Sequence, residues 1–553
     1  MPKNTLSLAE RFITSPAIRW TWSGLSDPDY RLPITEFRPC DKEAAIDMVQ
    51  GRYLLAARLV DTHSHSPFSI EMADAQWIER LNDFSWLRHF SACDDVNQKE
   101  FARVLVLDWI GRNGKFNHHT WSPIITSLRI LNWLRHLALL KEGASEKQIK
   151  IITRSIGTQV QSLKYRIKFM RDPINVMYSA MALLASALAK NSAPKTVSSR
   201  LKGLQSLINE QIDASGLHQS RNSFLQFKLL SELVSLKQTI GQTNHITSDD
   251  KEKFAEALKL MHFALESLTL GTSDLAYFNG SKQIATDLFV ALKANSQREE
   301  RKSLIVGDYG VLVSGQSILI ADSGKVPPIK FSKQAHASAL AFEFSYGNEL
   351  IIGNCGPAIT SQQMTKLEHE ENNHFRLGQA HNGAIVNNIS SAKIIKSGKY
   401  ANHLKNNHTL INDNRAIINL QADQETLSIT SKNYSKKFAL EIERKFSFID
   451  EGKTLVGIDK IRPTSNTQPH GLLELMFHLA PNSILTRNDG DNILDIELKS
   501  GARWIFLWEG AEVFIEESLR HSEHFGSLPI NKIVLKSDIS KNEEISWVFS
   551  RQY

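Results

Sequence analysis

The fold of this chain is decided at residues 297–324, where the sequence reads QREERKSLIVGDYGVLVSGQSILIADSG. The stretch begins with a charged link, 297–303, and continues as short runs of Leu, Ile and Val that end at Gly, Asp or Ser. Runs of this length, bounded by turn residues, are typical of β-strands. The link therefore predicts the start of a β-rich part of the chain.

Upstream of this link the apolar residues follow a helical spacing. Between about residues 75 and 295 they recur three or four positions apart, which places them on one face of a helix. The clearest runs are 101–111, 124–140, 176–189, 201–212, 224–240 and 252–270. Ser122 followed by Pro123 is typical of a helix start, and Gly143 of a helix end. Because no strand pattern lies between these runs, we expect antiparallel helical hairpins, packed as a bundle or as an incomplete α/α toroid.

Downstream of the link, strand-like runs recur to the end of the sequence without a helical pattern between them. So many strands in succession predict stacked antiparallel sheets, that is, a large sandwich. A chain of 553 residues is also longer than a single core usually supports. The predicted fold class is α+β with two domains: an incomplete α/α toroid over 75–296 and an antiparallel β-sandwich over 303–553. A weakly patterned extension, 1–74, precedes them.

Composition excludes several classes of protein. No apolar run reaches the roughly 18 residues that a membrane helix needs, so we expect no transmembrane segment. The first twenty residues show no apolar core followed by a cleavage site, so no signal peptide is readable. Cys40, Cys93 and Cys355 are scattered, which argues against a disulfide framework and against a cysteine zinc site.

The positive charge of the chain is concentrated in one segment. The net charge is +6 overall, but residues 101–228 hold 19 basic and 6 acidic side chains, a local net charge of +13. A field of this sign raises the local concentration of anions. Nucleic acid, anionic lipid and acidic polysaccharide all remain open as partners on this ground, as does an ordinary solvated basic face.

A polar and aromatic stripe marks the predicted helix at 124–140. Arg129, Asn132, Trp133 and His136 stand three or four positions apart and therefore share one face. A guanidinium beside an aromatic ring suits a sugar that carries a carboxylate or sulfate. An ordinary solvent-facing stripe is the alternative.

A second group of polar residues precedes the helix that starts near Phe224. In the loop 213–222, His218, Arg221 and Asn222 come just before a helix N-terminus, where free amides and the helix dipole favour an anion. Histidine can exchange a proton near neutral pH, while Arg and Asn can bind a carboxylate. A plain capping loop is the competing interpretation.

Two histidines of the β part stand among small residues at the ends of predicted strands. His336 and His381 could together bind a transition metal, although two imidazoles alone are a weak signal.

The strongest sequence signal is an ordered series of short strings that resembles heparinase II/III-family proteins of the shorter bacterial kind, over about residues 75–553. These strings are FSWLRHF (84–90), WSPIITSLRILNWLRH (121–136), GLHQSRN (216–222), YFNG (277–280), HASALAFEFS (336–345), NCG (354–356), AHN (380–382), FHLAP (477–481) and EESL (516–519). The resemblance implies an α/α toroid, a C-terminal antiparallel β-sandwich and a substrate cleft between them.

The resemblance also implies a chemistry. The characterised enzymes of the family are lyases that cleave uronic-acid polysaccharides by β-elimination, which requires neutralising the uronate carboxylate, removing the C5 proton and protonating the leaving oxygen. In the relatives an Asn or His with a Tyr or His performs these tasks, and a metal held by two His and an Asp supports the site.

Carried over to this sequence, the pattern is incomplete. His336 and His381 match the metal histidines, but Asn354 stands where the acidic ligand is expected, so a single zinc ion is the implied cofactor with a weakened site. Asn175 matches the toroid asparagine, followed by Val176 where lyases often have His.

The catalytic tyrosine expected after the loop 213–222 is absent, and His218 is its most credible replacement. Asn175, His218, Arg221 and Asn222 are therefore the candidate catalytic residues. The candidate substrate-binding residues are Arg129, Trp133, Trp121 and Asn279, the last two from the matching strings.

Two functions follow as hypotheses. The first is a lyase that cleaves an anionic, uronate-containing polysaccharide in a cleft between the two domains. The second is a glycan-binding or scaffolding protein of the cell envelope that keeps the fold without catalysis. A nucleic-acid partner is not expected, because the recognition motifs of such proteins are missing. The resemblance implies a cell-envelope or periplasmic location, with the cytoplasm as the alternative, and the oligomeric state stays open.

Overall fold

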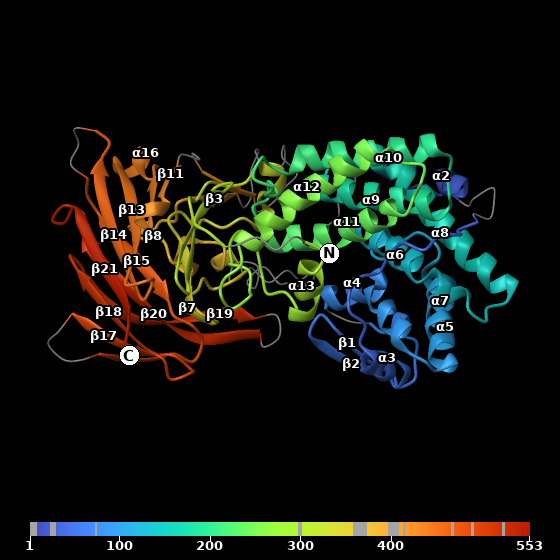
Figure 1. Cartoon of the computed structure of the whole chain (residues 1–553), viewed down its shortest axis with the longest axis horizontal. Helices are drawn as coiled ribbons and strands as arrows, with labels where there is room; N and C mark the ends of the chain where they lie inside the picture. Colours follow the sequence, from blue (N-terminus) through green and yellow to red (C-terminus); the bar gives the residue numbers. More distant parts are fainter. Residues whose placement is uncertain are drawn as a thin grey trace.

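The computed structural model describes residues 8–22, 29–71, 74–296, 301–357, 373–395, 409–412, 416–465, 469–487, 492–522 and 526–552. Helices lie at one end of the elongated molecule and strands at the other (Figure 1). The predicted α+β class, with a helical part followed by antiparallel sheets, is confirmed. Within the described ranges, no helix is long and apolar enough to cross a membrane.

The helical part contains long helices joined by short links, with one hairpin near its start. Its elements are α1 (Leu8–Ile13), α2 (Pro16–Arg19), η1 (Trp20–Trp22), α3 (Lys42–Val49), β1 (Arg52–Leu55), β2 (Arg58–Asp61), η2 (Pro67–Ser69), α4 (Ala75–Asp83), η3 (Ser85–Ala92), α5 (Val96–Asn113), α6 (Pro123–Arg135), α7 (Leu137–Lys141), α8 (Glu146–Arg166), η4 (Ile167–Phe169), α9 (Pro173–Ala189), α10 (Pro194–Gln211), α11 (Ser223–Gly241), α12 (Ser248–Ser267) and α13 (Thr286–Lys293).

Local sequence signals start these helices. Asp172 caps α9 by accepting hydrogen bonds from two backbone amides, with Pro173 in the first turn. Ser145 and Gln148 form a reciprocal capping box at the start of α8. Ser122 occupies the N-cap of α6 as expected, but its side chain makes no capping hydrogen bond. The single helix predicted over 124–140 is in fact α6 and α7, because the backbone leaves helical geometry at His136.

The β part consists of antiparallel strands. They are β3 (Leu304–Val306), β4 (Tyr309–Ser314), β5 (Ser317–Asp322), β6 (Phe342–Tyr346), β7 (Glu349–Ile352), β8 (Ala384–Val386), β9 (Lys393–Ile395), β10 (Thr409–Ile411), β11 (Ala416–Gln421), β12 (Thr426–Ser431), β13 (Leu440–Ile449), β14 (Thr454–Pro463), β15 (Leu472–His478), β16 (Ile484–Arg487), β17 (Ile493–Glu497), β18 (Arg503–Glu509), β19 (Glu512–Ser522), β20 (Gly526–Asp538) and β21 (Glu544–Arg551), with helical turns η5 (Ile329–Gln334), η6 (Gly378–Ala380), η7 (Ala422–Gln424) and α16 (Ser435–Phe438).

Three of the sheets share one core. An eight-stranded sheet runs in the order β11-β12-β13-β14-β21-β18-β17-β16, a four-stranded sheet in the order β19-β20-β15-β8, and a five-stranded sheet in the order β3-β4-β5-β6-β7. Strand β13 alternates buried and more exposed residues, so one of its faces is in the core. Phe342, Leu475 and Trp547, one from each sheet, belong to the same cluster of buried side chains.

The five-stranded sheet joins the two halves of the molecule. Leu217 and Phe278 of the helical part are buried in one cluster with Val306 and Ile320 of the sheet. This apolar contact fixes the loops that precede α11 and α13 against the β part.

Candidate functional site

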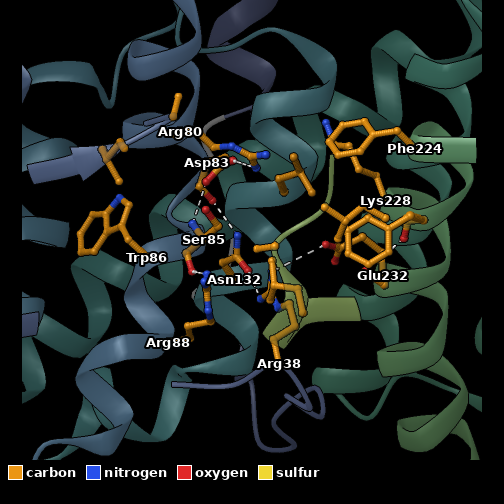
Figure 2. A pocket seen from close by; sticks show the side chains of 18 of the residues that line it. Arg38, Arg80, Asp83, Ser85, Trp86, Arg88, Asn132, Phe224, Lys228 and Glu232 are labelled. Atoms are coloured by element: carbon orange, nitrogen blue, oxygen red, sulfur yellow. Dashed lines mark hydrogen bonds and ion pairs between the residues drawn. The ribbon is translucent and has the colours of Figure 1, made fainter. Parts of the chain in front are cut away.

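A pocket with a cavity volume of about 350 Å³ opens inside the helical part (Figure 2). Its walls come from segments that are far apart in the sequence: the turn between β1 and β2, the end of α4 with η3, helices α6, α9 and α11, and the loop that leads into α13. A cavity of this size accommodates a small molecule or a short stretch of a polymer.

Two of the four cationic side chains that line the pocket are neutralised. Arg38 donates to Glu36 from Nε (2.8 Å) and to the amide oxygen of Asn132 from Nη2 (2.8 Å). Arg80 lies 3.4 Å from Asp83. These pairs hold the guanidinium groups in place but leave little positive charge for a ligand.

The other two cations, Arg88 and Lys228, have no carboxylate partner among the described residues. Arg88 donates to the backbone carbonyls of Pro39 (3.1 Å) and Ser85 (2.5 Å), and Lys228 makes no hydrogen bond or ion pair with a described side chain. Burial and the repulsion of neighbouring cations lower the pKa of Arg88 to about 10 and that of Lys228 to about 8. The pocket therefore presents two cations that form no ion pair with a described carboxylate.

Other polar groups of the pocket are mostly engaged. Glu232 is buried against Arg135 with a short hydrogen bond and lies 3.9 Å from Arg38. His89 accepts the backbone N–H of Asp41 at Nδ1 (2.9 Å), and burial lowers its pKa to about 3. The buried hydroxyl of Tyr178 has no hydrogen-bond partner among the described residues, and burial raises its pKa.

Aromatic side chains complete the pocket. Phe224 and Phe227 of α11 both line it, with ring centroids 6.3 Å apart, and Trp86 of η3 contributes from another wall. Aromatic faces pack well on the C–H surfaces of a sugar ring, while guanidinium groups bind carboxylates and sulfates. The arrangement suits a ring-shaped, negatively charged ligand.

The stripe predicted on α6 is mainly part of the core. Arg129 is fully buried, donates from Nε to Gln159 (2.7 Å) and stands 3.9 Å above the ring of Trp109. Trp133 packs edge-on against Trp109, with centroids 5.5 Å apart, and Trp121 is also buried beside that ring. None of the three lines the pocket, and their role in substrate binding stays a prediction. Asn132 of the same stripe does line the pocket.

His218 lies in the loop next to the pocket, but its side chain is fully buried. Its Nδ1 accepts the backbone N–H of Ser220 (3.0 Å), and Nε2 pairs with the amide oxygen of Gln211 (3.3 Å). Burial, with the nearby charge of Lys330, lowers the pKa of His218 to about 3. In this state the imidazole is neutral and engaged at both nitrogens, so proton transfer to a substrate would require the loop to open.

Arg221 and Asn279 connect the two halves of the molecule. Arg221 forms a buried pair with Asp322, 2.5 Å apart, and its guanidinium stands 4.5 Å from the ring centroid of Tyr309. Asn279 donates to the hydroxyl of Tyr309 (2.6 Å) and accepts the backbone N–H of His336 (3.1 Å). The structure thus brings these two predicted site residues together around Tyr309, in a buried network between the two halves.

Asn222 and Asn175 both stand in or next to the first turn of a helix. Asn222 caps α11 by accepting the backbone N–H of Leu225 (3.0 Å), and it donates to the amide oxygen of Gln334 (3.3 Å). Asn175 lies in the first turn of α9, half-buried, one turn before Tyr178. Each therefore precedes a residue of the same helix that does line the pocket.

Two of the three residues predicted to hold zinc, His336 and Asn354, use a side-chain donor atom in a hydrogen bond within the protein. The rings of His336 and His381 stack, with centroids 4.5 Å and planes 28° apart. His336 also accepts the backbone N–H of Gly280 at Nε2 (3.1 Å). The side-chain amide oxygen of Asn354 accepts the backbone N–H of Asn382 (2.9 Å).

No cluster of three His, Cys, Asp or Glu side chains suited to a metal ion occurs in the described part of the chain. Zinc stays a prediction from the resemblance, and no chemical step is assigned to it.

Sequence reasoning missed several polar residues that line the pocket. Arg80, Arg88, Tyr178 and Lys228 were not predicted as site residues. A signal existed for two of them: Lys228 interrupts the apolar run 224–240, and Arg88 lies inside the string FSWLRHF. A charged residue within a largely buried element needs a partner or a ligand.

Comparison with known proteins shows which proteins have a similar fold. Residues 296–548 match the family model of the heparinase II/III-like C-terminal domain. A crystal structure of heparinase III superimposes with a TM-score of 0.72 at 13% identity, covering 97% of this chain and 89% of that one. The heparan sulfate lyase HepC from Pedobacter heparinus gives a TM-score of 0.61 at 13% identity, covering 98% and 88%.

One curated relative is FtsZ-localized protein C of Caulobacter vibrioides (strain NA1000 / CB15N), which is 24% identical over 294 residues, or 52% of this chain. The chain spans about half the length of that relative, 50%. The resemblance to the heparinase II/III family, with its helical toroid and β domain, is confirmed at the level of fold. Residues 296–548 of this chain therefore resemble the heparinase II/III-like C-terminal domain, and the fold of the whole chain is similar to that of heparinase III.

Proposed function

We propose that this chain binds an anionic, uronate-containing polysaccharide in the pocket of its helical part and cleaves it by β-elimination. The reaction removes the proton at C5 and expels the glycosidic oxygen at C4. The adjacent carboxylate must be neutralised, because it otherwise resists the negative charge that develops at C5. A pocket with unpaired cations supplies that neutralisation.

The observation that carries the proposal is the pair Arg88 and Lys228, which line a 350 Å³ cavity without a carboxylate partner among the described residues. A guanidinium binds a carboxylate or sulfate through two parallel hydrogen bonds, and it stays charged at every physiological pH. The position of this cavity in a chain with a lyase fold supports a polysaccharide as the ligand.

A second function uses the same pocket without turnover. His218, the base that the sequence predicts, is buried with a pKa of about 3. The burial of His218 supports a glycan-binding protein of the cell envelope that does not catalyse a reaction. The name of the curated relative, FtsZ-localized protein C, also describes a location rather than a reaction.

The two functions are separated by measuring binding and turnover on the same polymers. We expect the purified chain to bind at least one of heparan sulfate, hyaluronan, polygalacturonate and alginate, and to release products that absorb through their new double bond. Binding without product on every polymer would favour the second function. Absence of binding to all of them would contradict both.

The binding measurement has a matched pair of variants. Arg88→Ala should weaken binding of the polymer by roughly 10-fold to 100-fold, because a charge-assisted hydrogen bond contributes about 1.5–3 kcal/mol. Arg503→Ala removes an arginine whose side chain is 72% exposed in the β part, and should leave the affinity unchanged. Equal affinities of the two variants would remove Arg88 from the proposed site.

The cell-envelope location expected from the resemblance belongs to this proposal too. Fractionation of cells that carry the tagged full-length protein tests it, with recovery in the cytosol as the contrary result.

A further inference from the structure

The pocket contains several titratable side chains, and their environments exclude most of them as a proton acceptor. The carboxylates of Asp83 and Glu232 are in ion pairs with Arg80 and Arg135, which occupy their oxygens. His89 has a pKa of about 3 and an occupied Nδ1. Tyr178 has its pKa raised by burial and stays protonated.

Lys228 is the remaining side chain with the geometry of a base. It stands on α11 one turn after Phe224, lines the cavity and is partly exposed to it. Glu232 lies one turn further along the same helix, where a lysine and a glutamate usually pair. Here Arg135 and Arg38 hold that carboxylate, so the amine of Lys228 is left without an acceptor of its own.

Resting on the function proposed above, we propose that Lys228 accepts the C5 proton of a uronate bound in this pocket. The neutral amine takes the proton and becomes an ammonium ion. The electron pair of the C5–H bond forms the C4–C5 double bond, and the pair of the C4–O bond leaves with the glycosidic oxygen. The ammonium ion then gives the proton to that oxygen, which restores the amine, so no other reactant is consumed.

The charges around Lys228 support this role. Burial disfavours its ammonium form most strongly, Arg80 of α4 and Lys282 of the loop before α13 repel that form, and Asp83 and Glu79 of α4 attract it. The resulting pKa of about 8 leaves roughly 10% of the amine neutral at pH 7, compared with less than about 0.1% for an ordinary lysine. Arg88 in the same pocket remains charged and can bind the substrate carboxylate.

The first test keeps the charge and removes the base. Lys228→Arg should bind the polymer within about 3-fold of wild type, because the cation is kept, while product formation falls at least about 100-fold, the usual contribution of general base catalysis. Lys253→Met is the control, since the side chain of Lys253 is 67% exposed on α12. Full turnover by Lys228→Arg would overturn the proposal.

The pH profile provides a readout that a structural role would not move. Product formation by wild type should rise with pH and level off with an apparent pKa near 8, as the amine becomes neutral. Addition of methylamine should restore part of the turnover of Lys228→Ala. A flat profile between pH 6 and pH 9.5, or no response to the amine, would count against Lys228.

A measurement without turnover guards against a folding defect in the variants. In the wild-type chain, the rate of arylation of Lys228 by fluorodinitrobenzene, followed by peptide mass spectrometry, should reach half its maximum near pH 8, and heparan sulfate should slow it. The corresponding midpoint for Lys253 should lie near or above the ordinary lysine value of about 10.4. Equal midpoints would overturn the assignment.

The outcomes distinguish the two proposals. Product from wild type and equal product from Lys228→Arg contradicts only the role of Lys228. Binding without product from wild type contradicts the proposed cleavage and, with it, the proton transfer, but leaves the pocket as a binding site.

Discussion

His218 has a pKa of about 3 because burial penalises the imidazolium ion and Lys330 adds a repulsive positive charge. The sequence alone suggested a base at this position, since histidine usually exchanges protons near neutral pH. The structure surrounds the ring with hydrogen-bond partners and excludes water from it. The same residue type therefore has a different chemistry here, set by its environment rather than by its identity.

This pKa predicts how stability depends on pH. In the unfolded chain His218 takes up a proton near pH 6.5, whereas in the folded chain it does so only near pH 3, so the contribution of the neutral ring is complete above pH 6.5 and is lost as the pH falls. At pH 5 this loss is about 2 kcal/mol. His218→Gln should therefore show a drop in unfolding free energy between pH 7 and pH 5 that is smaller than that of wild type by about this amount.

Urea unfolding at the two pH values measures the difference. His63→Gln is the control, because the side chain of His63 is 83% exposed. An unchanged pH dependence in His218→Gln would mean that the imidazole is not held neutral by the fold.

At the scale of elements, α11 has its capping residue and its pocket-lining residues at different positions. Its cap, Asn222, comes from the polar loop that the sequence singled out. Its first two turns then place Phe224 and Lys228 in the pocket. A helical face repeats every three to four residues, so Phe224, two residues after the cap, and Lys228, four residues further, lie on the same face. Helix α9 repeats this relation, with Asn175 in its first turn and Tyr178 in the pocket.

The cap predicts different results for two substitutions. Asn222→Ala removes the acceptor for the N–H of Leu225 and should lower the free energy of unfolding by about 1–2 kcal/mol. Asn222→Asp keeps the capping oxygen but loses the N–H that reaches Gln334, so it should lose less stability than Asn222→Ala and keep its turnover. Thermal unfolding and product formation are measured on both variants. Lost turnover in a stable Asn222→Asp variant would instead support the direct catalytic role that the sequence predicts.

At the scale of the whole molecule, the two halves are connected by burial and by charge. The apolar cluster of Leu217 and Phe278 with Val306 anchors the helical part on the five-stranded sheet. Beside it, Arg221 of the helical part and Asp322 of β5 form an ion pair whose side chains are 5% and 1% exposed. A buried pair of this kind costs much more to break than a surface pair, because removing one partner leaves the other charge buried.

The interdomain pair predicts a loss of stability and of cooperativity. Asp322→Ala should lower the free energy of unfolding by about 3–5 kcal/mol and separate the unfolding of the two halves in calorimetry. Asp308→Ala removes a carboxylate that is 33% exposed and 3.9 Å from Arg221, and should cost less than about 1 kcal/mol. Similar effects of both substitutions would show that the pair does not hold the halves together.

The sequence by itself determined the class and order of the elements. Helical spacing before residue 297 and short strands after it depend on neighbours within about ten positions, and such local patterns remain legible in the chain. Local chemistry also placed the caps, as Asp172 with Pro173 in α9 and the capping box in α8 show. The boundaries 1–74, 75–296 and 303–553 stay predictions of the same kind.

Only the tertiary structure decided which charges are free. Arg135 and Glu232 are 97 positions apart, and Arg221 and Asp322 are 101 apart, yet each pair is in contact and neutralised. Nothing in the sequence distinguishes Lys228 from other lysines. In the folded chain it is partly buried and forms no ion pair, because Arg80 and Arg135 contact the nearby carboxylates. Electrostatic pairing acts through space rather than along the chain, so the pocket and its cations emerge only when the folded chain brings them together.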